Sequence, residues 1–315
     1  MNDKFVKKLS ANVEGRDFIV GDLHGCYDEL LNLLGVVSFD IEKDRLISTG
    51  DLIDRGPKPL ECMALLEQDW FHCVKGNHES LLLYKALLLQ KGNFEDLNTM
   101  SKGEAEYIGQ FPKKLLKKIE SLPYIIEVEH LLLDKYYVVH AEFLPEHLLD
   151  QKNATIDKKI YKKLLYEIMH NDNTHLIDNF INNFNDTPEQ SALKEKLLWS
   201  RKIISDFYST NKEKINKFDF SFLNKTLDTK YQVFCGHNIV PFPMKIGQQY
   251  YLDTGAALGY TDKGNNSNFK TFNNFGHEFF GLSIIEVGSA EVYQCITNEA
   301  QRGTVKKMKN LLYKI

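Results

Sequence analysis

The N-terminal part of the sequence predicts an α/β protein, in which helices pack on a parallel or mixed β-sheet. Three strand-loop-helix units follow one another, over residues 17–37, 45–67 and 70–90. In each unit, a short apolar run typical of a strand passes through a polar loop into a segment with apolar residues at helical spacing. Right-handed crossovers join such units and bring their loops to one edge of the sheet. Open α/β sheets bind ligands at that edge.

The first two units are recognised by different helix signals. A strand over 17–20 leads into a helix over 27–37, where the leucines at 30, 31, 33 and 34 mark a buried face. A strand over 45–49 leads into the second loop, and Pro57 stands where the next helix, over 60–67, can begin.

The third unit has a strand over 70–74, a loop over 75–79 and a helix over 80–90. That helix is apolar nearly all round, so it is expected to be buried or to lie at an interface. A basic helix around residues 112–118 follows, and its charges are interpreted as a solvated face.

The second half of the chain predicts more strands that end at polar residues. Strands over 124–128 and 131–139 are joined by a turn at 129–130, and His140 follows the second of them. His237 follows a later strand in the same way. The other strands are expected at 231–235, 248–252, 278–287 and 291–296, and the amphipathic tail from residue 305 is expected to dock as a short helix.

Composition excludes several classes of partner. The formal net charge of -4 over 315 residues argues against a nucleic-acid partner, because such binding needs clustered Lys and Arg. No uninterrupted apolar stretch reaches the length of a membrane span, and the N-terminus lacks the apolar core of a signal peptide. The five cysteines form no C-x-x-C pair, which suits reduced thiols. A cytoplasmic location is therefore expected, and export into another cell without a cleavable signal stays open.

Six polar residues lie in loops that follow predicted strands, and two of the six share the first loop. They are Asp22, His24, Asp51, Asn77, His140 and His237. Oxygen and imidazole donors suit borderline and hard first-row metals. Six ligands, one of them a carboxylate that can bridge, predict two metal ions rather than one.

The stretch 50–56 adds a second acid and an arginine to this set. Asp51, Asp54 and Arg55 together could hold a cation and an anionic substrate. The alternative is a turn that ends a strand, with Asp54 and Arg55 as a surface ion pair.

These residues stand in recognisable motifs: Gly21-Asp-Leu-His-Gly25, Gly50-Asp-Leu-Ile-Asp-Arg-Gly56, Gly76-Asn-His-Glu79, and the histidines at 140 and 237. The motifs resemble those of the calcineurin-like metallophosphoesterases, and more narrowly the bacterial and lambda-phage form of the phosphoprotein phosphatase (PPP) family. The resemblance covers about half of the chain, mainly residues 16–80. It implies a four-layer αββα sandwich of two mixed β-sheets flanked by helices.

The resemblance also implies a role for each metal ligand. Asp22, His24 and Asp51 would hold the first ion, and Asp51 would bridge to a second ion. Asn77, His140 and His237 would hold that second ion, and Asn77 would also contact the substrate phosphate. The metals implied are manganese, iron or zinc, with manganese favoured.

Four further residues would handle the phosphate and the leaving group. By the same resemblance, His78 is the general acid and Asp54 orients it. Arg55 and Arg201 are the phosphate clamps, and Arg201 is placed only by the short block 199–202. Glu79 is a candidate for orienting a neighbouring arginine.

The function implied is metal-dependent hydrolysis of a phosphorylated protein or peptide, through in-line attack by a hydroxide that bridges the two ions. Phosphoserine and phosphothreonine are favoured, and phosphotyrosine stays open. A symmetrical diadenosine tetraphosphate hydrolase is the enzyme alternative, but such sequences generally have alanine and aspartate where this chain has Asp54 and Glu79. A phosphoprotein-binding scaffold is the non-enzyme alternative, disfavoured because no ligand is missing.

One domain is expected over residues 1–315, with a helical insertion over 142–198. The insertion has apolar residues at helical spacing and lies between His140 and Arg201. It is expected either to overhang the site as a cap that selects the substrate or to form a peripheral stabilising lobe.

Overall fold

The computed structural model describes residues 5–91, 107–143, 194, 196–205, 231–260, 280–297 and 301–308, with backbone alone for 87–91. Most of the predicted insertion over 142–198 therefore lies outside the described residues. Among the described residues, no helix is both long and apolar enough to cross a membrane.

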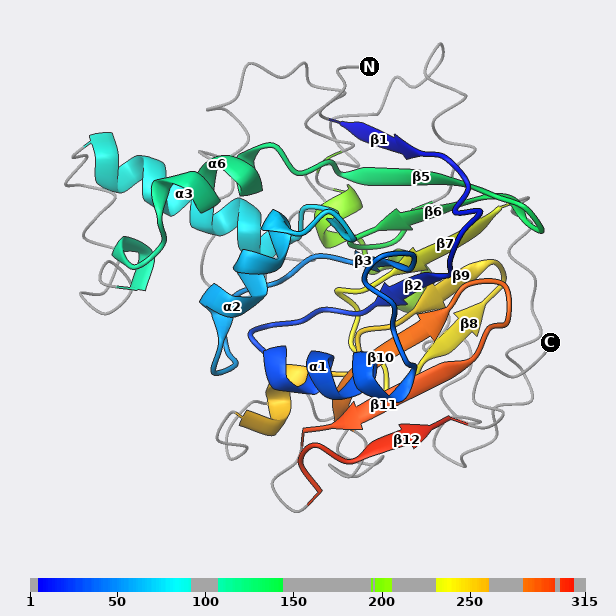
Figure 1. Ribbon diagram of the computed structural model, residues 1–315. Coiled ribbons are helices and arrows are strands. Elements are labelled where there is room, and N and C mark those ends of the chain that lie inside the picture. The colour runs from blue at the N-terminus through cyan, green and yellow to red at the C-terminus, as the bar shows by residue number, and fades with distance from the viewer. Residues whose placement is uncertain are drawn as a thin grey trace, which may run out of the picture.

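Two six-stranded mixed sheets form the centre of the protein (Figure 1). The first sheet has the order β12 (Val305–Lys307), β11 (Val292–Ile296), β10 (Gly281–Glu286), β2 (Asp17–Val20), β3 (Arg45–Ser48) and β4 (Phe71–Cys73). The second sheet has the order β1 (Val6–Leu9), β5 (Ile125–His130), β6 (Asp134–Val139), β7 (Gln232–Cys235), β9 (Gln249–Tyr251) and β8 (Met244–Ile246).

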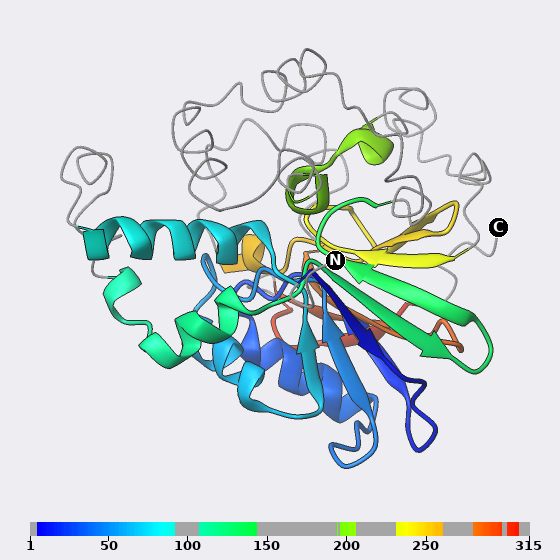
Figure 2. The same cartoon turned by 90° about the horizontal axis from the view of Figure 1, so that it is seen from above.

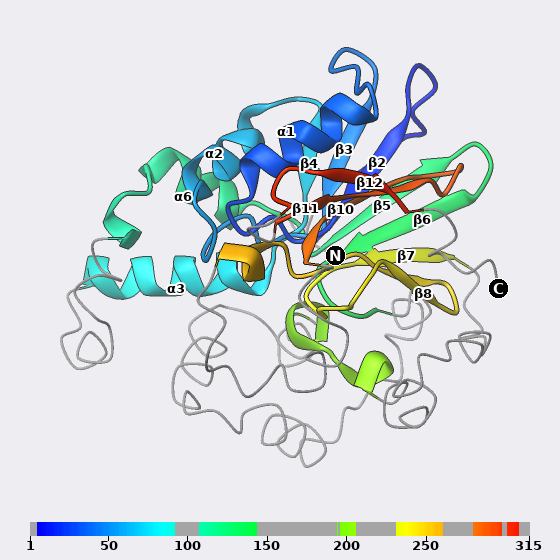
Figure 3. The same ribbon diagram turned by 90° about the horizontal axis from the view of Figure 1, so that it is seen from below.

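Helices lie on the outer face of the first sheet and beside it. They are α1 (Tyr27–Val36), α2 (Pro59–Ala64) with the 3₁₀ turn η1 (Leu65–Glu67), α3 (Asn77–Lys91) and α6 (Lys113–Glu120), and η3 (Ala256–Tyr260) is a second 3₁₀ turn. Beside the sheet, α3 packs on α6. In the view from below, α1, α2 and α6 lie on one side of the sheets and the segment 196–205 lies on the other (Figure 3). The predicted sandwich of two mixed sheets flanked by helices is thereby confirmed.

Three apolar clusters separate these layers. One lies between the two sheets and joins Ile19 and Ile47 of the first sheet to Val138 and Phe234 of the second. The others fill the space between the first sheet and its helices, and between the second sheet and residues such as Leu197. Burying a side chain like Ile19 completely stabilises the fold by roughly 1.5–3 kcal/mol. Because both faces of β2 are covered, its four residues are all buried rather than alternating.

Parallel pairing sets the position of the site. Strands β2, β3 and β4 are parallel neighbours, so their following loops lie at one edge of the first sheet. Strands β6, β7 and β9 are parallel neighbours in the second sheet and likewise end at one edge. Seen from above, the two sheets converge where these edges meet (Figure 2).

Some elements differ from their prediction. The turn between β5 and β6 lies at residues 131–133, where Leu131 and Leu132 are exposed although their apolar run suggests a strand. Residues 305–307 form the edge strand β12 on β11 rather than a helix, and residues 309–315 lie outside the described part. Strands β1 and β8 are short and β1 is lysine-rich, so periodicity does not reveal them. All five cysteines are buried and unpaired, as packing residues.

Candidate metal centre

Six polar side chains meet where the two sheets converge, each at the carboxyl end of a strand. The first sheet places Asp22 and His24 after β2, Asp51 after β3 and Asn77 after β4, at the first position of α3. The second sheet places His140 after β6 and His237 after β7. All six are buried. The structure thus brings every predicted metal-ligand residue to one place.

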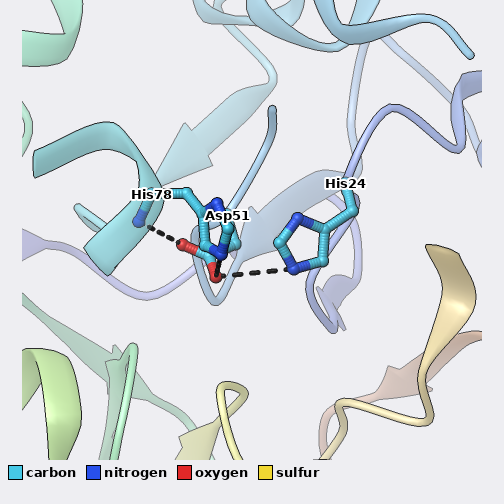
Figure 4. Close-up of side chains that lie close together, drawn as sticks. All are labelled: His24, Asp51 and His78. Carbon is cyan, nitrogen blue, oxygen red and sulfur yellow. Dashed lines mark hydrogen bonds and ion pairs between the residues drawn. The ribbon is translucent and has the colours of Figure 1, made fainter. Parts of the chain in front are cut away.

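Asp51 lies at the centre of the group. Its Oδ2 is 3.5 Å from Nε2 of His24, 3.5 Å from Nε2 of His140 and 3.8 Å from Nε2 of His78. Figure 4 shows the side chains of His24 and His78 beside this carboxylate, with dashed lines joining Asp51 to each histidine. The other oxygen accepts the backbone N–H of His78 at 3.0 Å. A carboxylate placed between two sets of nitrogen ligands is suited to bridge two ions.

A glycine makes this placement of Asp51 feasible. Gly50 has φ +102° and Asp51 has φ +50°, so the chain turns sharply as it leaves β3. A Cβ atom on Gly50 would lie 2.8 Å from the backbone nitrogen of Gly76. The loops after β3 and β4 can therefore approach only because this residue has no side chain.

The histidine tautomers are set by backbone carbonyl groups. Nδ1 of His24 donates to the carbonyl of Ile53 at 2.8 Å, and Nδ1 of His140 donates to that of Thr49 at 2.8 Å. Each neutral ring then presents the lone pair of its Nε2 to the site. Burial lowers the pKa of His24 to about 3 and also lowers the pKa of His140 and of His237. Neutral imidazoles are the form that binds metal ions.

The donor set fits divalent cations. Nε2 of His140 and Oδ2 of Asp51 are electron-pair donors that face each other. The buried Nε2 of His237 has no hydrogen-bond partner among the described residues. Burial, together with the charges of Asp253 and Asp51, raises the pKa of Asp22 well above its ordinary value. Burial of several carboxylates this close together costs free energy unless positive charge lies among them.

Among the described residues, potential ligand atoms form two groups, each with its members within 4.8 Å of one another. One group contains His24, Asp51 and His78, and the other contains Asp22, Asp51 and His140. The groups share Asp51, in agreement with a bridging carboxylate. His78 appears here beside the predicted ligands because it reaches the same oxygen of Asp51.

His78 also forms a short hydrogen bond with Asp54, from Nδ1 to Oδ2 at 2.5 Å. Burial disfavours the charged imidazole, but Asp51 and Asp54 outweigh it and raise the pKa of His78. Arg55 lies beside the same ring and donates to Nε2 of His78 at 3.1 Å and to Nε2 of His24 at 2.9 Å. Asp54 thus binds the histidine, while Arg55 turns into the site.

Arg201 reaches the site from the side of the second sheet. Its Nη1 donates to Oδ1 of Asn238 at 3.1 Å, next to His237 in the chain. The ring of Trp199 packs edge-on against the ring of His237, with 5.8 Å between centroids. Burial lowers the pKa of Arg201, and the carboxylates of Asp253 and Glu142 oppose that shift. The short sequence block 199–202 therefore lies beside the predicted ligands.

Two buried glutamates hold these loops in place, and sequence reasoning missed both roles. Glu79 accepts the backbone N–H groups of Asp51 at 2.9 Å, Leu52 at 2.7 Å and Gly76 at 2.9 Å. Its described hydrogen bonds are thus to backbone groups, contrary to the predicted contact with an arginine. Glu142 accepts the N–H groups of Ile203 and Ile204, each at 2.7 Å, and so holds the segment that carries Arg201.

Asp253 is a further acid of the site that received no predicted role. It is buried after β9 and accepts the backbone N–H of Gly255 at 2.9 Å. Burial raises its pKa to about 6, and the charges of Arg55 and Arg201 oppose the rise. Its position after a strand is the same signal that identified His140 and His237.

Comparison with known proteins decides the family. The sequence profile of the calcineurin-like phosphoesterases matches residues 18–241. The chain belongs to this family. The resemblance carried by its motifs is thereby confirmed at the family level. Members of the family use a dimetal centre, and the described residues include two candidate ligand groups.

Several relatives have names that indicate a substrate. Serine/threonine-protein phosphatase 2 of Salmonella typhimurium is 38% identical over 157 residues, which are 49% of this chain and 71% of that protein. Serine/threonine-protein phosphatase 1 of the same organism is 33% identical over 169 residues, 51% of this chain and 74% of that protein. A symmetrical bis(5'-nucleosyl)-tetraphosphatase of Actinobacillus succinogenes is 35% identical over 131 residues, 41% of this chain and 45% of that protein.

Among solved structures, a cold-active protein-tyrosine phosphatase of a Shewanella species matches with TM-score 0.48 and 17% identity, over 98% of this chain and 85% of that chain. A likeness this distant does not distinguish between substrates.

Proposed function

We propose that this protein is a dimetal phosphoprotein phosphatase that hydrolyses phosphomonoesters, with phosphoserine and phosphothreonine preferred over phosphotyrosine. The observation that carries the proposal is the 2.5 Å hydrogen bond between Asp54 and His78, beside the central carboxylate of Asp51. A serine or threonine alkoxide is a poor leaving group, so its departure benefits from a positioned acid. The relatives named serine/threonine-protein phosphatases support the same choice.

The proposed ligands form two sets that share one residue. Asp22, His24 and Asp51 would hold one ion, and Asp51, Asn77, His140 and His237 would hold the other. Bound there, manganese, in preference to iron or zinc, would activate water for attack and neutralise phosphate oxygens. The hydroxyl of Thr49 donates to Oδ1 of Asp22, and Nδ1 of His140 donates to the carbonyl of Thr49, so both hydrogen bonds orient proposed ligands.

His78 supplies the proton to the leaving oxygen. Its Nδ1 is engaged by Asp54, so Nε2 is the atom that can hold and release that proton. In the structure Arg55 donates to this Nε2, and two donors cannot face each other there. When substrate binds, Arg55 must therefore turn its guanidinium to the phosphate as Nε2 takes up a proton.

Arg55 binds the phosphate from the side of the first sheet, and Arg201 binds it from the side of the second sheet. A planar guanidinium can bind two phosphate oxygens at once, which a lysine ammonium cannot do with the same geometry. Asn238 holds Arg201 in place through its Oδ1, and its own amide donates to the carbonyl of Ser200 at 3.0 Å. Asn77 completes the proposed phosphate contacts.

The test is a comparison of initial rates with manganese on serine, threonine and tyrosine phosphopeptides and on diadenosine tetraphosphate. Faster hydrolysis of the serine and threonine peptides is expected. A much faster rate on the dinucleotide would replace the proposal by the symmetrical tetraphosphatase, a function that the relative from Actinobacillus succinogenes bears in its name. Absence of any manganese-stimulated hydrolysis would favour the phosphoprotein-binding scaffold.

Two substitutions test the metal centre within the same assay. Replacement of Asp22 or His237 by alanine should abolish metal-dependent hydrolysis of an aryl phosphate, since each contributes to the proposed ligand sets. Retained turnover in either variant would contradict the assignment.

We also propose that residues 142–198 form a helical cap, within one domain over residues 1–315, that selects the substrate. Its ends meet beside the site, because the backbone N–H of Ala141 donates to the carbonyl of Leu197 at 2.8 Å. Replacing residues 146–192 by a short linker should change peptide preference and spare small aryl phosphates. Loss of both activities would instead indicate a stabilising lobe.

A further inference from the structure

Tyr107 lies outside every motif of the sequence, yet its hydroxyl reaches the turn that follows Asp51. The oxygen accepts the backbone N–H of Asp54 at 3.1 Å. Burial and the nearby carboxylate of Asp54 raise the pKa of the Tyr107 phenol. Its ring packs edge-on against Phe111, with 5.0 Å between centroids. Tyr107 thus contacts Phe111 through its ring and the main chain of Asp54 through its hydroxyl.

The turn that Tyr107 contacts is strained. Asp54 and Arg55 both have φ +69°, in the left-handed region that residues with a Cβ atom disfavour. Residues held in this way are strained, and they persist only when their surroundings fix them. Within the turn, the carbonyl of Asp54 accepts the N–H of Gly56 at 2.8 Å. The bond to Tyr107 fixes it from outside.

The turn carries two functional side chains that point in different directions. Asp54 binds Nδ1 of His78, and Arg55 donates to Nε2 of His78 and of His24. A rotation of this turn would move both the carboxylate and the guanidinium relative to the imidazole of His78. A contact that fixes the turn therefore also fixes the distance between the imidazole of His78 and the guanidinium of Arg55.

We propose that Tyr107 is a positioning residue that locks the turn of Asp54 and Arg55, and thereby aligns His78 with the leaving oxygen of the substrate. This inference rests on the proposed phosphatase function. Within the described part of the chain, the Tyr107 hydroxyl makes no hydrogen bond to a proposed metal ligand, so it acts through Asp54. Its contribution is therefore largest when the leaving group needs a proton.

The dependence on the leaving group provides the test. Nitrophenolate leaves without help, whereas a serine alkoxide needs the acid. In the manganese-loaded Tyr107→Phe variant, the ratio of kcat for a phosphoserine peptide to kcat for p-nitrophenyl phosphate should fall by about 10-fold relative to wild type. A ratio that stays at the wild-type value would overturn the proposal.

Tyr293→Phe is the matched control. It removes a hydroxyl that donates to Glu291 at 2.8 Å on β11, in the first sheet. This variant should leave the ratio unchanged. Because both substrates are assayed on one sample, the ratio is independent of the amount of folded protein. It can be measured below the unfolding temperature of Tyr107→Phe if that variant is less stable.

A double-mutant cycle establishes the route of action. If Tyr107 acts through Asp54, the ratio for Tyr107→Phe/Asp54→Asn should equal that for Asp54→Asn alone. Additive effects would show a separate route and overturn the proposal. Failure of the proposed function gives a different result, because wild type itself would then hydrolyse the phosphopeptide much more slowly than diadenosine tetraphosphate, or not at all.

Discussion

The two sheets contribute to the site in different ways. The first sheet supplies Asp22, His24, Asp51 and Asn77 from three consecutive loops, which parallel pairing of β2, β3 and β4 places side by side. The second sheet supplies His140 and His237 from loops that are far apart in the sequence. One half of the centre is thus built locally, and the other half depends on contacts over long sequence distances.

A buried glutamate stabilises each half. Glu79 joins the loop after β3 to the loop after β4 through three backbone N–H groups, so it acts on proposed metal ligands. Glu142 joins the loop after β6 to the N–H groups of Ile203 and Ile204, so it acts on the segment of Arg201, the proposed phosphate clamp. The difference suggests that damage to the first half weakens metal binding, and damage to the second half weakens substrate binding.

The largest effect is expected where the two halves meet. Asp51→Ala should lower kcat with manganese by roughly 10³-fold or more, because metal stabilisation of transition-state charge is worth several kcal/mol. His237→Ala should abolish turnover as well, but it should leave one manganese site intact, since His237 belongs to one proposed ligand set only. Asp69→Asn, at an exposed position, is the control. Equal loss of manganese binding in the Asp51 and His237 variants, measured by isothermal titration, would contradict a bridging role confined to Asp51.

The next effect concerns the acid within the first half. Asp54→Asn should lower kcat on a phosphoserine peptide by about 10²-fold. The raised pKa of His78 keeps it protonated to higher pH, and activity that needs this proton is lost as pH rises through that pKa. Removing the negative charge of Asp54 should therefore move the alkaline limb of the kcat profile to lower pH. If the alkaline limb of the kcat profile did not move, the ionisation that it reports would not be that of His78.

The two glutamates allow a direct test of the comparison. Glu79→Gln should weaken manganese binding by about 10- to 100-fold, as expected when a group that orients metal ligands is changed. Glu142→Gln should instead raise KM for the phosphopeptide by about 10-fold and leave manganese affinity unchanged, because the misplaced group is Arg201. Isothermal titration with manganese and steady-state kinetics separate these outcomes. If Glu79→Gln instead raised KM and Glu142→Gln weakened manganese binding, the expected difference between the two halves would be wrong.

The smallest effect concerns fold stability away from the site. Asp44 accepts hydrogen bonds from the backbone N–H and the guanidinium of Arg16, the shortest at 2.7 Å. Burial opposes ionisation, but these bonds and the N–H of Asp40 lower the pKa of Asp44. The stabilisation is therefore present above the ordinary carboxyl pKa of about 4 and is lost as pH falls through the lower folded value.

Asp44→Asn should consequently lower the free energy of unfolding at pH 7 by about 1–2 kcal/mol and reduce its dependence on acid pH. Denaturant unfolding at pH 7 and at pH 3 measures both quantities. The kcat of the folded variant should match wild type. A change in kcat would show that the first half of the site also depends on contacts that lie away from it, such as the one between Asp44 and Arg16.

The sequence predicted the parts of the site that depend on local order. The strand over 17–20 was predicted with the observed bounds, and all six proposed ligands follow strands as expected. Glycine-flanked loops after parallel strands leave a clear pattern, because the same residues both end the strand and carry the ligands. The family resemblance added the roles of Asp54, His78 and the arginines, which no spacing rule supplies.

The sequence did not predict the supporting contacts, because these join distant residues. Tyr107 lies 53 positions from Asp54, and Glu142 lies 61 positions from Ile203. No sequence pattern marks a tyrosine or glutamate that makes such a contact, because its partner comes close only in the folded chain. Glu79 was given the wrong partner for the same reason. The short edge strands β1, β8 and β12 were missed because their few residues show no clear alternation.

The five buried cysteines have a practical consequence for studying the protein in solution. Each is unpaired and shielded by packing, and burial raises the pKa of thiols such as Cys26 and Cys73. Maleimide reagents attack accessible thiolates, so the native chain should react slowly. A cysteine introduced at the exposed Leu132, on the tip between β5 and β6, would then carry a fluorophore at one defined position. Because Leu132 precedes β6 and His140 follows its other end, the fluorophore would lie away from the site, and no native thiol would need to be removed.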